Sequence, residues 1–150
     1  MNKVTNLRNE DHVMRYVPWG KLRRDGDDNV IGFLPQAFQL RPGEPSLSVN
    51  WLEFFPNPET RVRDCVWAMR KVRSVGAKSA FAIGNVGKIK DTCLKHGFSV
   101  RVVHEPKKCE PAHSAIRRLP PDDLTLLAAL AEDAFIEMIH NAQVPGQSTG

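Results

Sequence analysis

The most strand-like run of the sequence is LSVNWLEFF (47–55). Leu47, Val49 and Trp51 occupy every second position, so they share one face of a strand, and the residues between them share the other. Pro56 follows and ends the run, because proline cannot donate a backbone hydrogen bond to a sheet. We take this stretch as the best-defined strand of a sheet that dominates the first third of the chain.

Two earlier runs have the same character. The first is HVMRYVP (12–18), with the period-two alternation of a strand, and the second is VIGFLPQAFQL (30–40), which Pro35 interrupts. The connections between these runs are short, and short connections join antiparallel rather than parallel strands. A mainly antiparallel β portion is therefore expected from about residue 12 to residue 55.

The pattern changes after residue 59. Apolar residues recur at helical spacing in ETRVRDCVWAMRKVRSVG (59–76), and a strand, a short helix and a strand are then predicted from SAFAIGNV (79–86), GKIKDTCLKH (87–96) and FSVRVVHE (98–105). Such a succession favours a right-handed crossover between two parallel neighbouring strands. The run PPDDLTLLAALAEDAFIEMIHN (120–141) predicts a long amphipathic helix, with prolines and acidic residues suited to its first turn.

These elements together predict the α+β class. We expect one domain over residues 11–141, in which a mainly antiparallel β portion is followed by an α/β portion and a C-terminal amphipathic helix. The polar ends, residues 1–10 and 142–150, are expected to be flexible.

Composition indicates a soluble, cytoplasmic protein. The 150 residues are 41% hydrophobic and 25% charged, and they contain no apolar run long enough to cross a membrane. The first residues lack the apolar core of a signal peptide. Three cysteines form an odd number without a C-x-x-C motif, which is typical of a reducing compartment.

Charge is segregated along the chain. Residues 61–118 carry 14 basic and 4 acidic side chains, a formal charge of +10, whereas residues 119–150 carry five acidic side chains and no basic one. The basic segment could form a positive face that attracts phosphates or an acidic partner. Alternatively, the acidic last helix could pack beside it and cancel the charge.

The leading functional hypothesis is a binding module for nucleic acid or an acidic protein. Arg63, Trp67 and Arg70 share one face of the predicted helix and Lys71 lies nearby, so an aromatic ring flanked by arginines could stack a base and pair with phosphates. Lys88 lies in AIGNVGKIKD (82–91), a turn between strand and helix that could cradle an anion or could simply require small residues. These five residues are the candidate binding residues.

The alternative is a small enzyme acting on RNA or a nucleotide. In VVHEPKKCEPAHSAIRR (102–118), His104 and His113 could exchange protons while Arg15 or Arg117 holds a phosphate. That chemistry requires the histidines to converge in space. The competing interpretation is a stiff structural loop beyond the end of a strand.

The same stretch contains His104, Cys109 and His113, which are three possible zinc donors in the pattern H-x4-C-x3-H. A fourth protein ligand is missing from the local pattern. We therefore expect no metal and no cofactor.

Another enzymatic interpretation comes from the order of polar residues along the strands. His12 and Arg15 precede Ser48 and Asn50, and Glu105 follows on a later strand. This order resembles ADP-ribosyltransferase folds, in which such residues hold a nicotinamide dinucleotide. The E-x-E or Q-x-E element of that family is absent here, because Glu105 stands in HEPKK.

The chain also resembles a family of short bacterial proteins. The similar phrases are HVMRYVPW (12–19), LSVNWLEFF (47–55) and EPAHSAIRRLP (110–120), and the resemblance extends over residues 11–140. It implies a bacterial, cytoplasmic setting and assigns no activity or catalytic residue. A third function therefore stays open, a protein-interaction subunit that buries WLEFF (51–55) and the last helix against a partner.

Overall fold

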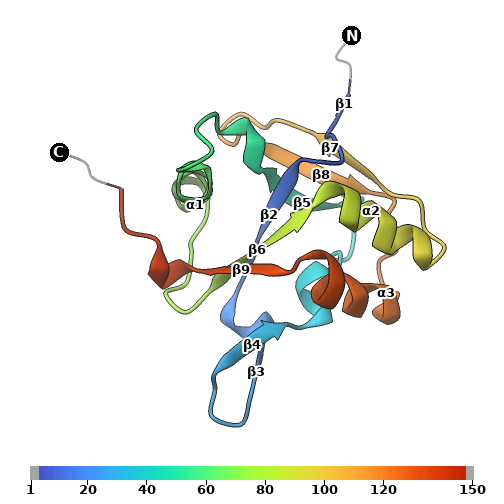
Figure 1. Ribbon diagram of the computed structural model, residues 1–150, viewed down its shortest axis with the longest axis horizontal. Coiled ribbons are helices and arrows are strands. Elements are labelled where there is room, and N and C mark those ends of the chain that lie inside the picture. The colour runs from blue at the N-terminus through green and yellow to red at the C-terminus, as the bar shows by residue number, and fades with distance from the viewer. Residues whose placement is uncertain (1–3, 148–150) are drawn as a thin grey trace.

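A seven-stranded antiparallel sheet forms the centre of the computed structural model, which describes residues 4–147 (Figure 1). Its strands are β1 (Thr5–Asn6), β2 (His12–Val17), β5 (Ser46–Trp51), β6 (Ala80–Asn85), β7 (Arg101–His104), β8 (His113–Arg117) and β9 (Glu137–His140). They lie in the order β1-β7-β8-β5-β2-β6-β9. A separate hairpin of β3 (Leu22–Arg24) and β4 (Val30–Phe33) projects from the sheet.

The stretch 47–55 supplies the central strand, β5, and then turns into a short 3-10 helix at Leu52–Phe54. Leu47 and Val49 enter the larger of two hydrophobic cores, as the alternation predicts. Their polar neighbours Ser48 and Asn50 therefore point to the opposite face.

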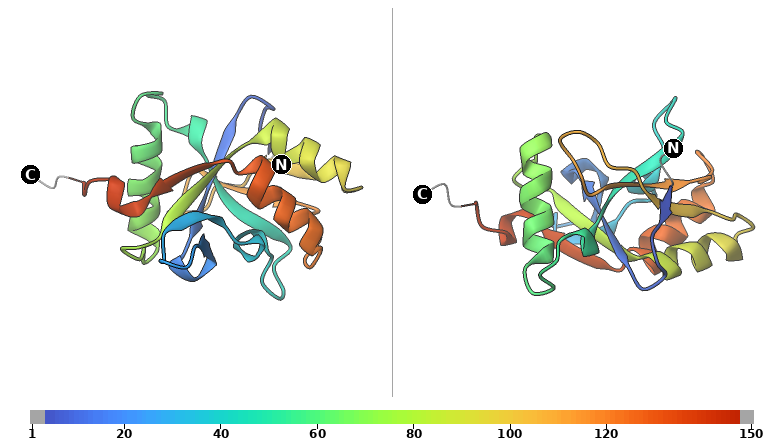
Figure 2. Two further views of the ribbon diagram at one scale, coloured as in Figure 1. Left: turned by 60° about the horizontal axis from the view of Figure 1, so that its bottom comes forward. Right: turned by 90° about the horizontal axis from the view of Figure 1, so that it is seen from above.

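Helices cover both faces of the sheet (Figure 2). The face with the larger core carries α2 (Val86–Lys95) and α3 (Leu124–Ala129), and the other face carries α1 (Arg61–Val72) over a smaller core. In that smaller core Cys65, Val66 and Met69 of α1 meet Met14 and Phe81 of the sheet. The fold is α+β, as predicted, and none of the helices in residues 4–147 is long and apolar enough to span a membrane.

The expected parallel crossover was wrong. The strands β6 and β7 do precede and follow α2 in the sequence, but in the sheet β2, β5 and β8 lie between them. Every strand pairing in the described residues is antiparallel. The stretch 102–118 begins in β7 and ends in β8, and residues 105–112 form the loop that joins these two paired strands. Local sequence predicted these strands but not which strands they would pair with.

The last helix is much shorter than predicted. The helix α3 ends at Ala129, a turn of π-helix covers Leu130–Ala134, and β9 then pairs antiparallel with β6. Phe135 leaves the helix at this point and stacks on Phe38, with the ring centroids 4.4 Å apart. The apolar spacing of the sequence continues through Met138, but that residue belongs to the strand.

Parts of both chain ends contact the body of the fold. Thr5 and Asn6 pair with β7, and Leu7 is buried in the larger core. Near the other end, Val144 packs against the smaller core. Residues 1–3 and 148–150, which also belong to the ends predicted to be flexible, lie outside the described residues.

Gly84 provides a test of this packing. A Cβ atom on Gly84 would lie 2.9 Å from Phe135 Cδ1 and 3.1 Å from Ile89 Cδ1, so a side chain has no room there. We expect Gly84→Ala to lower the free energy of unfolding by about 1–3 kcal/mol, as overpacking does. Urea denaturation measures the change.

The matched control is Gly32→Ala, because a Cβ at Gly32 meets nothing within 4 Å. Equal stability of the two variants would contradict the close approach of Phe135 to β6.

Candidate functional site

The central strands β2 and β5 separate after a short ladder. They pair only at Val13↔Trp51 and Met14↔Asn50, whereas β2 pairs with β6 along its whole length. Arg15 follows this ladder, and its side chain donates from Nε to the Ala37 carbonyl at 2.7 Å and from Nη1 to the Ser48 carbonyl at 2.7 Å. The guanidinium therefore takes the place of the next backbone pairing.

A polar cavity of about 170 Å³ opens at this gap. Six separate parts of the chain contribute to it, including the two central strands, the loop before β5, the end of α1 and the β7–β8 hairpin. The lining residues are Arg15, Tyr16, Pro18, Lys21, Ala37, Arg41, Glu44, Ser48, Arg73, Lys107, Glu110 and His113.

The cavity carries an excess of positive charge. Five of its side chains are cationic and two are carboxylates, which gives a formal charge of +3 with His113 neutral. Among the described residues, only Arg73 of the five cations forms an ion pair with a carboxylate, at 3.1 Å from Glu110. With the Asn50 amide turned so that its nitrogen faces the neighbouring acceptors, this nitrogen also donates to the Glu110 carboxylate at 3.1 Å.

Two of the cations, Arg15 and Lys21, have a lowered pKa, so the protein disfavours their charged forms. Burial lowers the pKa of Arg15 to about 10, with Glu44 opposing the shift and the nearby charges of Arg41 and Arg73 adding to it. Burial also lowers the pKa of Lys21, and so do the charges of Arg15 and Arg41. In both cases burial and the neighbouring cations lower the pKa by more than the Glu44 carboxylate raises it.

A serine and a histidine meet in the wall of the same cavity. His113 Nε2 lies 3.2 Å from Ser48 Oγ, and His113 Nδ1 lies 2.9 Å from the Glu105 carbonyl oxygen. The His113 side chain is only 3% exposed. Its ring is thus fixed in orientation between the hairpin and the central strand.

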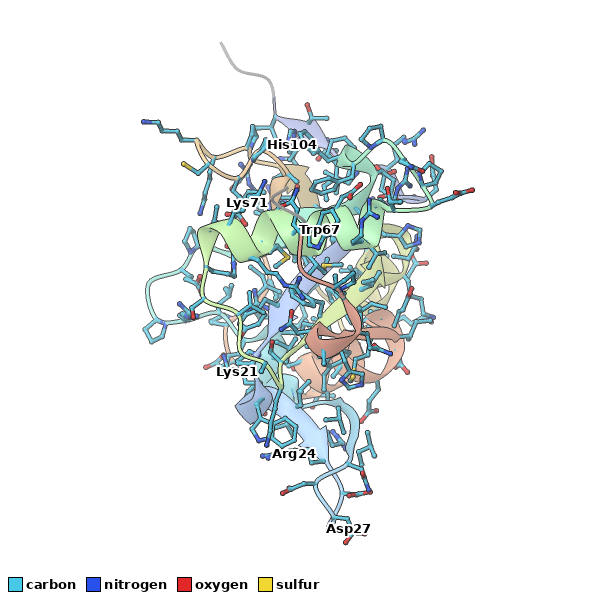
Figure 3. All side chains as sticks on the ribbon, turned by 90° about the vertical axis from the view of Figure 1, so that its left-hand side faces the viewer. Lys21, Arg24, Asp27, Trp67, Lys71 and His104 are labelled. Atoms are coloured by element: carbon cyan, nitrogen blue, oxygen red, sulfur yellow. The ribbon has the colours of Figure 1, made fainter. Side chains whose placement is uncertain are left out.

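The two candidate catalytic histidines do not converge. His104 is paired with Ser114, the neighbour of His113, so the two histidines point to opposite faces of the sheet. The His104 ring packs on Trp51 with the two ring centroids 5.1 Å apart, and its Nε2 lies 2.7 Å from the Pro111 carbonyl oxygen. In Figure 3, His104 lies near the upper end of the molecule and the cavity residue Lys21 lies below the middle.

The other two residues of the proposed catalytic set also differ in placement. Arg15 lines the cavity beside Ser48, whereas Arg117 forms an ion pair with Glu105 and does not line it. The structure therefore brings Arg15 and His113 to one cavity and places His104 and Arg117 elsewhere.

The possible zinc donors do not form a metal site. His104 and His113 occupy opposite faces, and Cys109 is exposed in the hairpin turn. Within residues 4–147, no cluster of three or more histidine, cysteine or acidic side chains is arranged to hold a metal ion.

The residues that resemble an ADP-ribosyltransferase are only partly brought together. Arg15 and Ser48 meet in the cavity, but His12 is bound to Glu53, with Nδ1 2.8 Å from Oε2. Glu105 is occupied by its ion pair with Arg117.

The candidate binding face of α1 is engaged by the C-terminal segment, residues 141–145 (Figure 3). Trp67 Nε1 donates to the Pro145 carbonyl at 2.8 Å. Arg70 makes five hydrogen bonds, to Asn141, Val144 and Pro145. Arg63 lies 4.3 Å above the Trp67 ring and bonds to Asp64, while Lys71 is exposed.

The turn before Lys88 has its donors satisfied within the protein. The first three amides of α2 donate to the Asp11 carbonyl, the Asn9 carbonyl and the Asn85 side chain. No donor of these three is left for an anion, so the tight-turn interpretation describes this segment.

No protein-family model, curated protein sequence or solved structure shows a significant match to this chain. The functional argument therefore rests on the cavity.

Several cavity residues gave no signal in the sequence. Arg41 and Glu44 stand in the turn RPGEPS, and Arg73 follows α1 among other basic residues. Only the folded arrangement distinguishes these residues from ordinary surface charges. Arg15, Ser48 and His113 were singled out because of their chemical type, and the structure brings them together.

The role of Arg70 can be tested by mutation. Arg70→Ala removes the hydrogen bonds to residues 141–145, so we expect a loss of about 1–3 kcal/mol of stability. Limited proteolysis with a protease of broad specificity should then cut this segment faster, as mass spectrometry would show.

Lys71→Ala is the matched control, since Lys71 is the next residue on α1 and makes no hydrogen bond with the described residues. If the two variants were equally stable and equally resistant, Arg70 would not be holding the C-terminal segment.

The three cysteines should differ sharply in reactivity. Cys109 is exposed, whereas Cys65 and Cys93 are buried, and burial raises the pKa of both buried thiols, to about 11 for Cys93. Ellman's reagent at pH 8 should label one thiol quickly in the native protein and three after unfolding, because the thiolate is the reactive form.

Cys109→Ser should abolish the fast phase. A second fast thiol in the native protein would show that one of the cores opens more readily than the packing indicates.

Proposed function

We propose that this protein binds a phosphate-bearing ligand, with the phosphate group in the Arg15 cavity. The observation that carries the proposal is the half-buried guanidinium of Arg15, which faces a cavity with four other cations and forms no ion pair with any described carboxylate. Clusters of cations with perturbed pKa values in a concave site are typical of anion-binding sites.

The geometry favours phosphate over other anions. Arg15 uses Nε and Nη1 for backbone carbonyls, and Nη2 makes no hydrogen bond with the described residues. Nη2 can therefore donate to a ligand oxygen, and Lys21, Arg41 and Lys107 add charge around it. A dianion with three terminal oxygens matches a formal charge of +3 better than a single carboxylate does.

The size of the cavity limits what it holds. The volume of about 170 Å³ is sufficient for a phosphate group, and a larger ligand would extend through the mouth of the cavity. A terminal phosphate, on a small molecule or at the end of a nucleic acid, suits this position better than a phosphodiester inside a chain.

The proposal replaces the polyanion expected from the sequence by a ligand that ends in a phosphate group, and it assigns different contact residues. The expectation from sequence used Arg63, Trp67 and Arg70, and Trp67 and Arg70 are bonded to the C-terminal segment. The cavity instead draws Arg73 and Lys107 from the basic segment and Arg15, Lys21 and Arg41 from outside it.

Isothermal titration calorimetry with inorganic phosphate tests the proposal. Five heavy atoms at no more than about 1.5 kcal/mol each limit the affinity to the micromolar range, so we expect a Kd between roughly 10 µM and 1 mM. Arg15→Leu removes a charge-assisted donor and should weaken binding about 10- to 100-fold. Arg41→Gln, at an exposed position, should weaken it less and keeps the test independent of core packing.

Lys88→Gln is the matched control, because it removes one positive charge far from the cavity lining. Equal effects of Arg41→Gln and Lys88→Gln would mean that only the net charge matters. A wild-type protein that binds no phosphate would refute the proposal.

A second probe separates the two sources of phosphate. A short single-stranded RNA with a terminal phosphate should compete with inorganic phosphate, and the same RNA with hydroxyl ends should not. Competition by both RNAs would instead favour the extended polyanion surface that the charge segregation predicts.

A further inference from the structure

The cavity contains a serine whose hydroxyl is hydrogen-bonded to a histidine of defined tautomer. A carbonyl oxygen can only accept a hydrogen bond, so His113 Nδ1 must donate its proton to the Glu105 carbonyl at 2.9 Å. In the neutral ring Nε2 then carries the lone pair, and it accepts from Ser48 Oγ at 3.2 Å. This is the arrangement in which a histidine activates a serine nucleophile.

The surrounding backbone holds this pair in place. Glu105 and His113 face each other in the β7–β8 hairpin, where the Glu105 amide donates to the His113 carbonyl at 2.9 Å. Ser48 lies on the neighbouring central strand, so both side chains come from paired strands of one sheet. Such a base needs no rearrangement before it accepts a proton.

The pair shares its cavity with Arg15. Arg15 donates from Nη1 to the carbonyl of Ser48 itself at 2.7 Å, and Arg15, Ser48 and His113 line one cavity. A phosphate held by Arg15 would occupy the cavity that the Ser48 hydroxyl also lines. The surrounding cations would stabilise the charge on its oxygens during transfer.

We propose that Ser48 is a nucleophile and His113 its general base, and that the protein hydrolyses phosphate monoesters. The inference rests on the proposed function, because it requires the phosphate to occupy the Arg15 cavity. Within this site, Ser48 and His113 act on the reacting atoms, and Arg15 binds the phosphate oxygens.

The reaction has two balanced steps. Ser48 Oγ gives its proton to His113 Nε2 and attacks phosphorus, and the bond from phosphorus to the ester oxygen on the opposite side breaks. The departing oxygen takes a proton from solvent water at the mouth of the cavity, which leaves hydroxide. Water then attacks the phosphoserine from the mouth and gives a proton to that hydroxide, while Ser48 Oγ leaves phosphorus and takes back the proton held on His113 Nε2. Inorganic phosphate is released.

The substrate class follows from the shape of the cavity. His113 is only 3% exposed, so the reacting pair belongs to the inner wall. An in-line displacement from this wall directs the leaving group toward the mouth of the cavity. A monoester with its alcohol portion in solvent meets this condition.

The experiment uses p-nitrophenyl phosphate with the full chain. We expect release of p-nitrophenol, and acid quenching should trap a phosphoryl group that mass spectrometry locates on Ser48. Ser48→Ala should reduce release to the rate without protein and still bind inorganic phosphate. His113→Gln should reduce it about 100-fold or more, as the loss of a general base does.

Two variants serve as matched controls. Ser46→Ala removes a hydroxyl two residues away on the same strand, and His104→Gln changes the histidine on the opposite face of the sheet. Both should keep the wild-type rate.

The outcomes separate the two proposals. Phosphate binding without turnover and without a Ser48 adduct would overturn the nucleophile and leave the binding function in place. Turnover that persists in Ser48→Ala would also overturn it. The absence of phosphate binding and turnover together would remove both proposals, whereas a Ser48 adduct on the wild-type protein supports the mechanism even if a variant fails to fold.

Discussion

The fold and the candidate site both depend on how Arg15 fills the gap between the two central strands. Once the ladder between β2 and β5 ends at Met14, the Ser48 carbonyl on the edge of β5 needs a donor, and Arg15 supplies one. The same guanidinium satisfies the Ala37 carbonyl of the short helix beside it. Because buried carbonyls must be paired, a cation at this position keeps the centre of the sheet open without leaving its backbone unsatisfied.

This arrangement has an energetic cost. Burial lowers the pKa of Arg15 to about 10, so the folded protein disfavours the charged form of this side chain. Above about pH 10 the unfolded chain binds more protons than the folded protein, so this contribution to stability rises with pH there, and the full penalty applies at neutral pH. An anion that pairs with Arg15 would offset the penalty. Uncompensated charge of this kind is typical of sites built for a ligand rather than for stability.

Elements with local signals could be predicted from the sequence, and elements decided by distant contacts could not. The helix α2 has a local signal, because Asn85 caps it by accepting from the Lys88 amide. The strand β9 has no local signal. The helix before it ends where the Phe135 ring packs against Gly84, and the space for this ring exists only because Gly84, some fifty residues earlier, has no side chain. The site follows the same division. Residue chemistry drew attention to Arg15 and His113, but the cavity that they line is built from six separate segments of the chain. A one-residue offset in the hairpin places His104 on the other face.

The distribution of charge in the fold explains why the cavity stays positive. The acidic end of the chain could have cancelled the basic segment, yet none of its five carboxylates lines the cavity. Asp123 caps α3 by accepting from the Leu126 amide, and Glu132 lies 3.9 Å from Arg23 near the β3–β4 hairpin. The helix α3 belongs to the larger core, on the face opposite α1, whereas Arg73 follows directly from the end of α1. The sheet therefore separates these acids from part of the cationic wall, and the only carboxylates among the described residues that line the cavity are Glu44 and Glu110.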